Sequence, residues 1–276
     1  MQRGMWHLAG LALLAVLVPT LSANTATQDN MSLQMAKDVL ETTGIKGGFV
    51  VHLGCADGKL TAALRAGDGF LVQGLDTDPN AVGEARKYIM SQGLYGPVSV
   101  DRLAGACLPY VDNFVNLLVA ERLGDIPMSE VTRVLAPNGV ACLKEGQGWK
   151  HITKPWPKEI DEWTHYFHDA TANPVAHDTT VGPPRRYQWI GSPRWSRHHD
   201  HMSSISALVS AHGRLFYIMD EGSRASIQLP AHWSLIARDA FNGTILWKRS
   251  IPAWNTHKWP LKSGPAQVTR RLVAVG

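Results

Sequence analysis

The residues with the clearest chemical potential lie between two apolar runs near the start of the chain. Gly54 and Gly58 bound a short turn after the run 49–53, and Asp76 ends a second apolar run 22 residues after Gly54. Glycines in such a turn let the backbone approach a ligand at the start of the following helix, and an acidic residue about 20 positions downstream accepts hydrogen bonds from ribose hydroxyls. The pattern therefore predicts a site for a nucleoside-bearing ligand.

A second group of candidate ligands lies in a later segment rich in Pro, Trp and His. Histidine and carboxylate side chains at this density could ligate zinc or copper, and we expect His165 and His168 to share one face of a helix. His198, His199 and His201 follow further along. Because no strict ligand spacing is met, the favoured interpretation is a hydrogen-bonded packing surface between domains, with no bound metal.

The surrounding sequence predicts the elements that would position the first site. An amphipathic helix over 31–43 is followed by strands that alternate with helices, which indicates an open α/β sheet. The expected strands are 49–53, 70–76, 98–100, 113–120 and 140–144, and the expected further helices are 59–66, 81–92 and 129–135. Pro137-Asn138-Gly139 is expected to be a turn before the fifth strand. Residues 149–154 are expected to form a hairpin with that strand.

At this point four segments resemble the class I S-adenosylmethionine-dependent methyltransferases, in the order of that family. They read VVHLGCADG, GLDTDPNAVGEAR, LPYVDNFVNLLVAE and RVLAPNGVACL, and they cover about residues 45–145. The resemblance implies that Asp76 binds the ribose and that Asp101 lies on the adenine side. The residues that it implies for S-adenosylmethionine binding are Gly54, Cys55, Ala56, Gly58, Asp76, Thr77 and Asp101.

The chain departs from the family pattern at several of these positions. His52 stands where the first motif has an acid, Ala56 replaces its middle glycine, and Asn116 stands where an Asp usually precedes the fourth strand. The sheet ends early, no Asn-Pro-Pro-Tyr-type segment holds an amino-group substrate, and no catalytic base stands out. The methyl acceptor and the catalytic residues are therefore unknown.

The last third of the chain changes to a β pattern. Strands are expected at 206–210, 214–220, 233–239, 244–248 and 272–275, with a hairpin turn at Asn242-Gly243. The segment LIARDAFNGTILWKRSI resembles the repeat of quinoprotein (PQQ)-like β-propellers. A propeller needs at least four blades of four strands, so residues 185–276 represent one to two blades of an incomplete propeller, and the sequence is expected to be a fragment of a longer protein. We do not expect PQQ in this fragment.

The N-terminus has the features of a secretory signal. Arg3 precedes the uncharged apolar run 8–18, and Leu21-Ser22-Ala23 offers a cleavage site. The run is too short to span a membrane, so no transmembrane segment is expected after cleavage, and the protein is expected outside the cytoplasm. The three cysteines, Cys55, Cys107 and Cys142, indicate neither a disulfide framework nor a zinc site. Four regions result: 1–23 signal peptide, 24–148 methyltransferase-like domain, 149–184 bridge and 185–276 partial propeller.

Charge is distributed unevenly between the two halves. Residues 24–148 contain 10 Lys and Arg against 14 Asp and Glu, whereas residues 149–276 contain 16 against 9. An anionic partner could meet the basic half, but its positive charges are scattered, so nucleic acid is not the expected partner and the partner is unknown.

Three functions are compatible with these observations. The first is an S-adenosylmethionine-dependent methyltransferase. The second is a degenerate, non-catalytic Rossmann domain that serves as a scaffold for an extracytoplasmic propeller, which binds a partner. The third, less favoured, is a redox protein with a quinone or metal in the propeller or the His-rich bridge.

Overall fold

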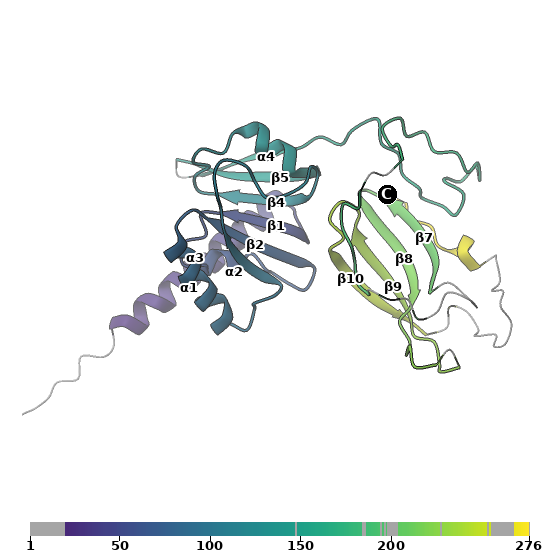
Figure 1. The fold of residues 1–276 in the computed structure, drawn as a ribbon, viewed down its shortest axis with the longest axis horizontal. Coiled ribbons are helices and arrows are strands. Elements are labelled where there is room, and N and C mark those ends of the chain that lie inside the picture. The colour runs from purple at the N-terminus through teal and green to yellow at the C-terminus, as the bar shows by residue number, and fades with distance from the viewer. Residues whose placement is uncertain are drawn as a thin grey trace, which may run out of the picture.

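The structure, a computed structural model, contains an α/β part and a separate antiparallel sheet, connected by a long bridge (Figure 1). It describes residues 20–146, 148–183, 186–193, 195, 197, 204–226, 228–252, 254 and 268–275, with side chains from residue 28 onward. Among these residues no helix has the length and apolar character needed to cross a membrane. The predicted signal segment lies largely outside the described residues, and so do His198, His199 and His201.

The α/β part is built on a six-stranded sheet in the order β3-β2-β1-β4-β5-β6. The first five strands are parallel and β6 is antiparallel to β5. The strands are β1 (Gly48–Leu53), β2 (Phe70–Asp76), β3 (Val98–Arg102), β4 (Val115–Ala120), β5 (Leu135–Glu145) and β6 (Gly148–Thr153). This is the strand arrangement of a Rossmann-like sheet, in which the strand order reverses beside β1.

Helices cover both faces of this sheet. The helices are α1 (Thr20–Thr43), α2 (Lys59–Ala63), α3 (Pro79–Ser91) and α4 (Met128–Val134). The first three helices pack into one buried cluster, through Val39 of α1, Leu60 of α2 and Ile89 of α3. Helix α4 packs into a second cluster on the opposite face, through Val131. Because both faces are covered, β1 and β4 are apolar along almost their whole length, as parallel strands require.

Most of the predicted α/β elements are confirmed, with two differences. The first helix begins at Thr20 rather than at residue 31, so it continues through the predicted cleavage position. Pro137-Asn138-Gly139 is not a separate turn but part of the 11-residue strand β5, which pairs with β4 across a register shift near Leu117. Between the pairs Val115↔Leu135 and Leu117↔Val140, four residues of β5 lie opposite one residue of β4, so Pro137-Asn138-Gly139 occupy an irregular part of the ladder.

The predicted hairpin after the fifth strand is also present. β6 pairs with β5 from Glu145↔Gly148 to Val140↔Thr153. Residues 149–153 of the predicted bridge therefore belong to the α/β sheet. Since β5 runs from the amino edge of the parallel strands to their carboxyl edge, β6 returns the chain to the amino edge.

The second sheet is a four-stranded antiparallel meander in the order β10-β9-β8-β7. Its strands are β7 (Ile205–Ala211), β8 (Arg214–Asp220), β9 (Trp233–Asp239) and β10 (Ile245–Ile251). Four strands are what one propeller blade contains, and the propeller itself remains a prediction. The prediction of a strand over 272–275 is wrong. These residues follow a 3-10 helix, η1 (Val268–Arg271), and lie outside any strand.

Candidate functional site at the carboxyl edge of the parallel sheet

The turn after β1 has the backbone shape that the sequence predicted. Gly54, Ala56 and Gly58 all have positive φ angles, of 76°, 44° and 80°. Ala56 therefore adopts the left-handed conformation that usually falls to glycine, at a cost of about 1–2 kcal/mol. Alanine at this position therefore strains the turn.

The two glycines serve different purposes. A Cβ atom at Gly58 would lie 2.8 Å from the Cβ of Ala85, so glycine is required where α3 packs against the start of α2. A Cβ atom at Gly54 would meet no atom within 4 Å. Gly54 thus borders open space, which is where a ligand could approach the backbone.

Asp76, the last residue of β2, is hydrogen-bonded to the turn after β1. Its Oδ2 accepts a hydrogen bond from the backbone N of Ala56 at 3.0 Å, and its Oδ1 accepts one from the backbone N of Asp78, also at 3.0 Å. Asp78 in turn caps α3 by accepting from Asn80 N at 2.9 Å. Each carboxylate oxygen of Asp76 has two lone pairs, so each can accept one further hydrogen bond.

The remaining predicted residues divide into exposed and buried ones. Thr77 and Asp101 are exposed at the same edge, where Asp101 forms an ion pair with Arg86 at 3.2 Å. The Cys55 side chain is buried under the turn, and burial raises the pKa of its thiol to about 12. Only the backbone of Cys55 is therefore available at this edge, and its thiol is chemically inert at neutral pH.

His52, in the position of the missing acid, is buried at 3% exposure. Its Nδ1 lies 2.8 Å from Thr61 Oγ1, and its Nε2 has no hydrogen-bond partner. Burial lowers the pKa of His52 to about 4, against the weaker opposing effect of Asp76. The residue is therefore a neutral imidazole that cannot replace the charge of a carboxylate.

At the amino edge, Asn116 connects the two sheets. Its Oδ1 accepts from Phe49 N at 2.7 Å and from Asn242 Nδ2 at 2.6 Å, and its Nδ2 donates to Asp239 Oδ2 at 2.8 Å. Asn242 also donates to Phe114 O at 2.9 Å. Asn116 therefore docks the β9–β10 turn onto β1 and β4, and its place in the family pattern gives no sign of this role.

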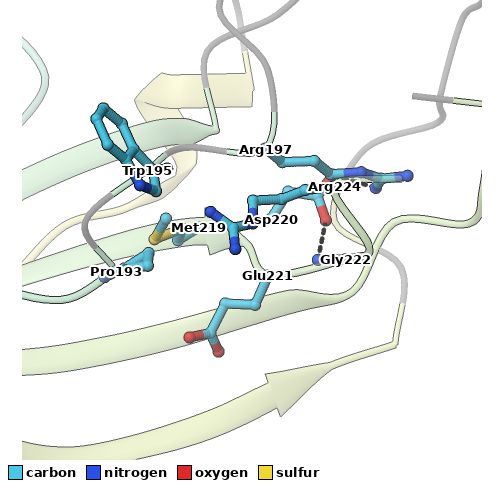
Figure 2. A pocket seen from close by; sticks show the side chains of 8 residues that line it. All are labelled: Pro193, Trp195, Arg197, Met219, Asp220, Glu221, Gly222 and Arg224. Atoms are coloured by element: carbon cyan, nitrogen blue, oxygen red, sulfur yellow. Dashed lines mark hydrogen bonds and ion pairs between the residues drawn. The ribbon is translucent and has the colours of Figure 1, made fainter. Parts of the chain in front are cut away.

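A cavity of about 370 Å³ adjoins this contact between the sheets. Lys46 and Arg214 contribute cationic groups to it, and Phe241 and Trp247 contribute aromatic rings. A second cavity, of about 320 Å³, lies at the end of β8 beside Trp195 and Arg197 (Figure 2).

The second cavity borders a buried ion pair that organises the end of β8. Arg197 Nη1 lies 2.7 Å from Asp220 Oδ2, and both side chains are almost fully buried. Arg197 also donates to the carbonyl oxygens of Ser223, Ser226 and Leu229. Because its guanidinium is engaged with the chain itself, we assign it a structural role.

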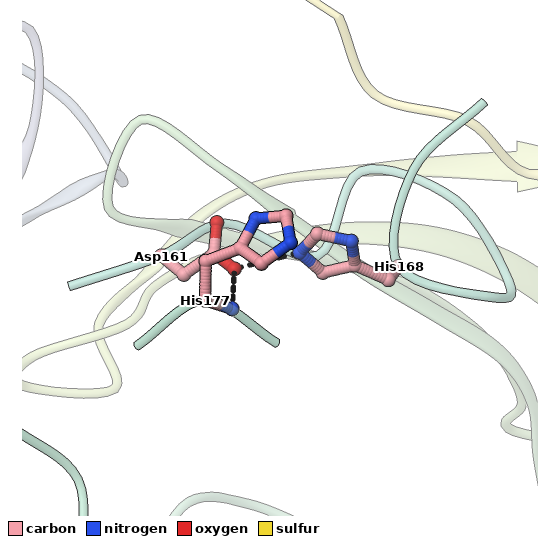
Figure 3. A group of neighbouring side chains, drawn as sticks. All are labelled: Asp161, His168 and His177. Atoms are coloured by element: carbon pink, nitrogen blue, oxygen red, sulfur yellow. Dashed lines mark hydrogen bonds and ion pairs between the residues drawn. The ribbon is translucent and has the colours of Figure 1, made fainter. Parts of the chain in front are cut away.

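The bridge does not place its histidines as predicted. His165 and His168 form a β-bridge rather than sharing a helix face. His168 instead lies beside Asp161 and His177, a residue outside the predicted ligand set (Figure 3). Hydrogen bonds, first from the backbone N of His177 and also from His168, hold the pKa of Asp161 at about 2. Asp161 is therefore ionised at neutral pH.

Comparison with known proteins gives one similarity in sequence. No family model matches the chain. Over 119 residues it is 32% identical to the methyltransferase GfsG of Streptomyces halstedii, a match that covers 41% of this chain and 43% of that protein. The chain thus spans less than half the length of this curated relative.

Similar solved structures include a SAM-dependent methyltransferase from Aquifex aeolicus, with a TM-score of 0.38, 21% identity, and coverage of 50% of this chain and 79% of that chain. Geranyl diphosphate methyltransferase in complex with SAM has a TM-score of 0.36, 18% identity, and coverage of 40% and 48%. From the strand order and the similarity in sequence, the α/β part has the Rossmann-like fold of a class I S-adenosylmethionine-dependent methyltransferase.

Proposed function

We propose that the α/β part binds S-adenosylmethionine at the carboxyl edge of its sheet and acts as a methyltransferase on an acceptor that is still unknown. The observation that supports this best is the bond between Asp76 and Ala56, which preserves the turn despite the loss of a glycine. The 32% identity to a methyltransferase, over a stretch of 119 residues, adds support from sequence.

The residues at this edge suit the nucleoside portion of the cofactor. Asp76 offers the free lone pairs of a half-buried carboxylate, and Gly54 offers backbone beside open space. Thr77 and Asp101 are exposed on the neighbouring strand ends. When bound, S-adenosylmethionine supplies a methyl group on a sulfonium centre, and the task of these residues is to bind and orient it. Such transfer can depend mainly on positioning.

One position fits the cofactor less well. His52 is neutral and buried where the family has an acid, so it adds no negative charge near a cofactor ammonium group. Its Nε2 has no hydrogen-bond partner within the protein and is open to one hydrogen bond, as donor or acceptor according to the tautomer. We therefore expect weaker binding than a carboxylate at this position would give.

A second candidate function is that of a non-catalytic scaffold. The hydrogen bonds of Asn116 with Asp239 and Asn242 favour it, because they join the α/β part to two buried polar side chains of the second sheet and its turn. In this proposal the α/β part orients a larger β structure outside the cytoplasm, where it binds a partner, and the nucleoside site is unused.

Calorimetric titration of the full-length chain with S-adenosylmethionine and with its demethylated product distinguishes the two. We expect both to bind, and we expect Asp76→Ala to weaken binding at least tenfold because the ribose loses its acceptor. Asp68→Ala is the matched control, since Asp68 is an exposed carboxylate paired with Arg65 in the loop before β2. If neither compound binds at millimolar concentration, the methyltransferase proposal is wrong and the scaffold proposal remains.

A further inference from the structure

The side chains of Asp161, His168 and His177 converge although they come from separate parts of the bridge (Figure 3). One ligand atom of each lies within 4.8 Å of the other two. His168 Nε2 and Asp161 Oδ2 are 2.6 Å apart. Zinc bonds of about 2.0 Å place neighbouring ligand atoms about 3.3 Å apart, so a small opening of this contact would admit an ion.

The surroundings of His168 have the arrangement found around metal-bound imidazoles. His168 is buried, with its Nδ1 3.3 Å from Asp169 Oδ2 while its Nε2 faces Asp161. A metal-ligating histidine usually donates its second ring N–H to a carboxylate, which fixes the ring and its tautomer. Asp169 is itself held by Thr171, whose backbone N and Oγ1 both donate to its Oδ1.

The position of the third side chain, His177, is not explained by hydrogen bonds of its ring. Its backbone N donates to Asp161 Oδ2 at 2.6 Å. Its ring lies 5.1 Å from the His168 ring, at an interplanar angle of 79°. Within the described part of the chain the ring makes no hydrogen bond, and it is exposed to solvent. The cluster therefore contains an imidazole whose nitrogen is available to a ligand.

From these contacts we propose that Asp161, His168 and His177 form a binding site for a divalent first-row transition metal ion such as Zn²⁺. Two imidazoles and one carboxylate are a donor set that suits such ions. Three protein ligands leave a coordination position open on the exposed side, where His177 lies. The site differs from the predicted histidine set, with which it shares only His168.

An ion here would stabilise a segment that has little regular structure of its own. Residues 154–183 contain no helix or strand, and Trp163 connects them to strand β7 at the edge of the second sheet through two hydrogen bonds. Ser210 N donates to Trp163 O at 2.7 Å, and Trp163 N donates to Ser210 Oγ at 2.8 Å. Because a metal that binds only the folded state adds its binding free energy to stability, Zn²⁺ should raise the melting temperature.

The test is a calorimetric titration of the full-length chain with Zn²⁺ after removal of metals with EDTA, together with the absorption spectrum of the Co²⁺ form. We expect one ion per chain and d–d bands of a low-coordinate site. His177→Ala should reduce the affinity at least 100-fold with only a small change in the urea midpoint of the metal-free protein, because its exposed side chain makes one ring contact and loses no hydrogen bond. Asp169→Asn should reduce affinity about 10- to 100-fold.

His165→Ala is the matched control, because the His165 ring contacts only the neighbouring Thr164 hydroxyl among the described hydrogen bonds. We expect this variant to bind Zn²⁺ as the parent chain does. The proposal is wrong if the parent chain takes up no stoichiometric Zn²⁺, or if His177→Ala binds as tightly as His165→Ala. It is also wrong if affinity is lost only when His198, His199 and His201 are all replaced by Ala.

Discussion

Asp76 and Asp239 are two strand-ending aspartates with the same local hydrogen bond, and they lie at opposite edges of the parallel sheet. Each accepts a hydrogen bond from the backbone N two residues further on. Asp239 is 6% exposed and also accepts from Asn116 Nδ2 and Asn242 N. Asp76 is half-buried, with one partner on each oxygen. The surroundings of the two aspartates therefore differ in that the carboxylate of Asp239 is enclosed by donors of the protein, whereas that of Asp76 remains accessible for a further hydrogen bond.

The largest effect is expected from Asp239→Ala. The change leaves three donors without their acceptor, namely the buried backbone N of Asn242 and the partly buried Asn116 Nδ2 and Phe241 backbone N. Each unsatisfied buried donor costs about 1–3 kcal/mol, so we expect the free energy of unfolding to fall by about 3–5 kcal/mol. Urea denaturation measures this. A loss below 1 kcal/mol would show that the contact between the sheets is not held by this carboxylate.

The next effect is a pH dependence that comes from His52, buried beneath the exposed turn. Its pKa is about 4 in the folded protein and about 6.5 in the unfolded chain. The unfolded state therefore binds the extra proton between these values, and stability is lost as the pH falls from 6.5 to 4, by about 3 kcal/mol. Urea unfolding at a series of pH values should show this slope in the parent chain and a weaker one in His52→Leu. Equal slopes would contradict burial of a neutral imidazole.

Asp76→Ala should have a smaller effect on stability, in contrast to Asp239→Ala. The backbone N of Ala56 and of Asp78 lose an acceptor, but both residues are exposed to water. We expect a loss of about 1 kcal/mol in urea denaturation, the usual value of a single exposed hydrogen-bonded cap. A loss as large as that of Asp239→Ala would remove the distinction between the two edges.

The smallest effect is expected from Asp101→Ala. The Asp101 and Arg86 side chains are 64% and 43% exposed, and such surface ion pairs contribute little. The free energy of unfolding should change by less than about 0.5 kcal/mol. If calorimetry of the same variant shows weaker binding of S-adenosylmethionine, Asp101 belongs to the ligand site along with Asp76.

Much of the α/β fold could be predicted because its signals are local. The runs that become β1, β2 and β4 are mostly apolar, and the spacing between Gly54 and Asp76 places both at one edge of the sheet. The register of β5 with β4 is a long-range property, which is why Pro137-Asn138-Gly139 resembles a turn but remains in the strand.

The contacts that could not be predicted join residues far apart in the chain. Asn116 and Asp239 are 123 positions apart, and nothing in either local sequence indicates the other. His177 reaches His168 only because the bridge folds back through irregular turns, which have no periodicity to detect. His168 has a positive φ of 67°, which a helical interpretation of the segment does not allow.

The β5–β6 hairpin has a consequence for how this chain accommodates further structure. Each parallel strand crosses the sheet from its amino to its carboxyl edge, and one antiparallel strand reverses the crossing. The chain therefore leaves the α/β sheet after Thr153 at the edge remote from the glycine turn. A longer or differently shaped β structure could be appended through this exit without narrowing the approach to Asp76, so the two edges are free to change independently.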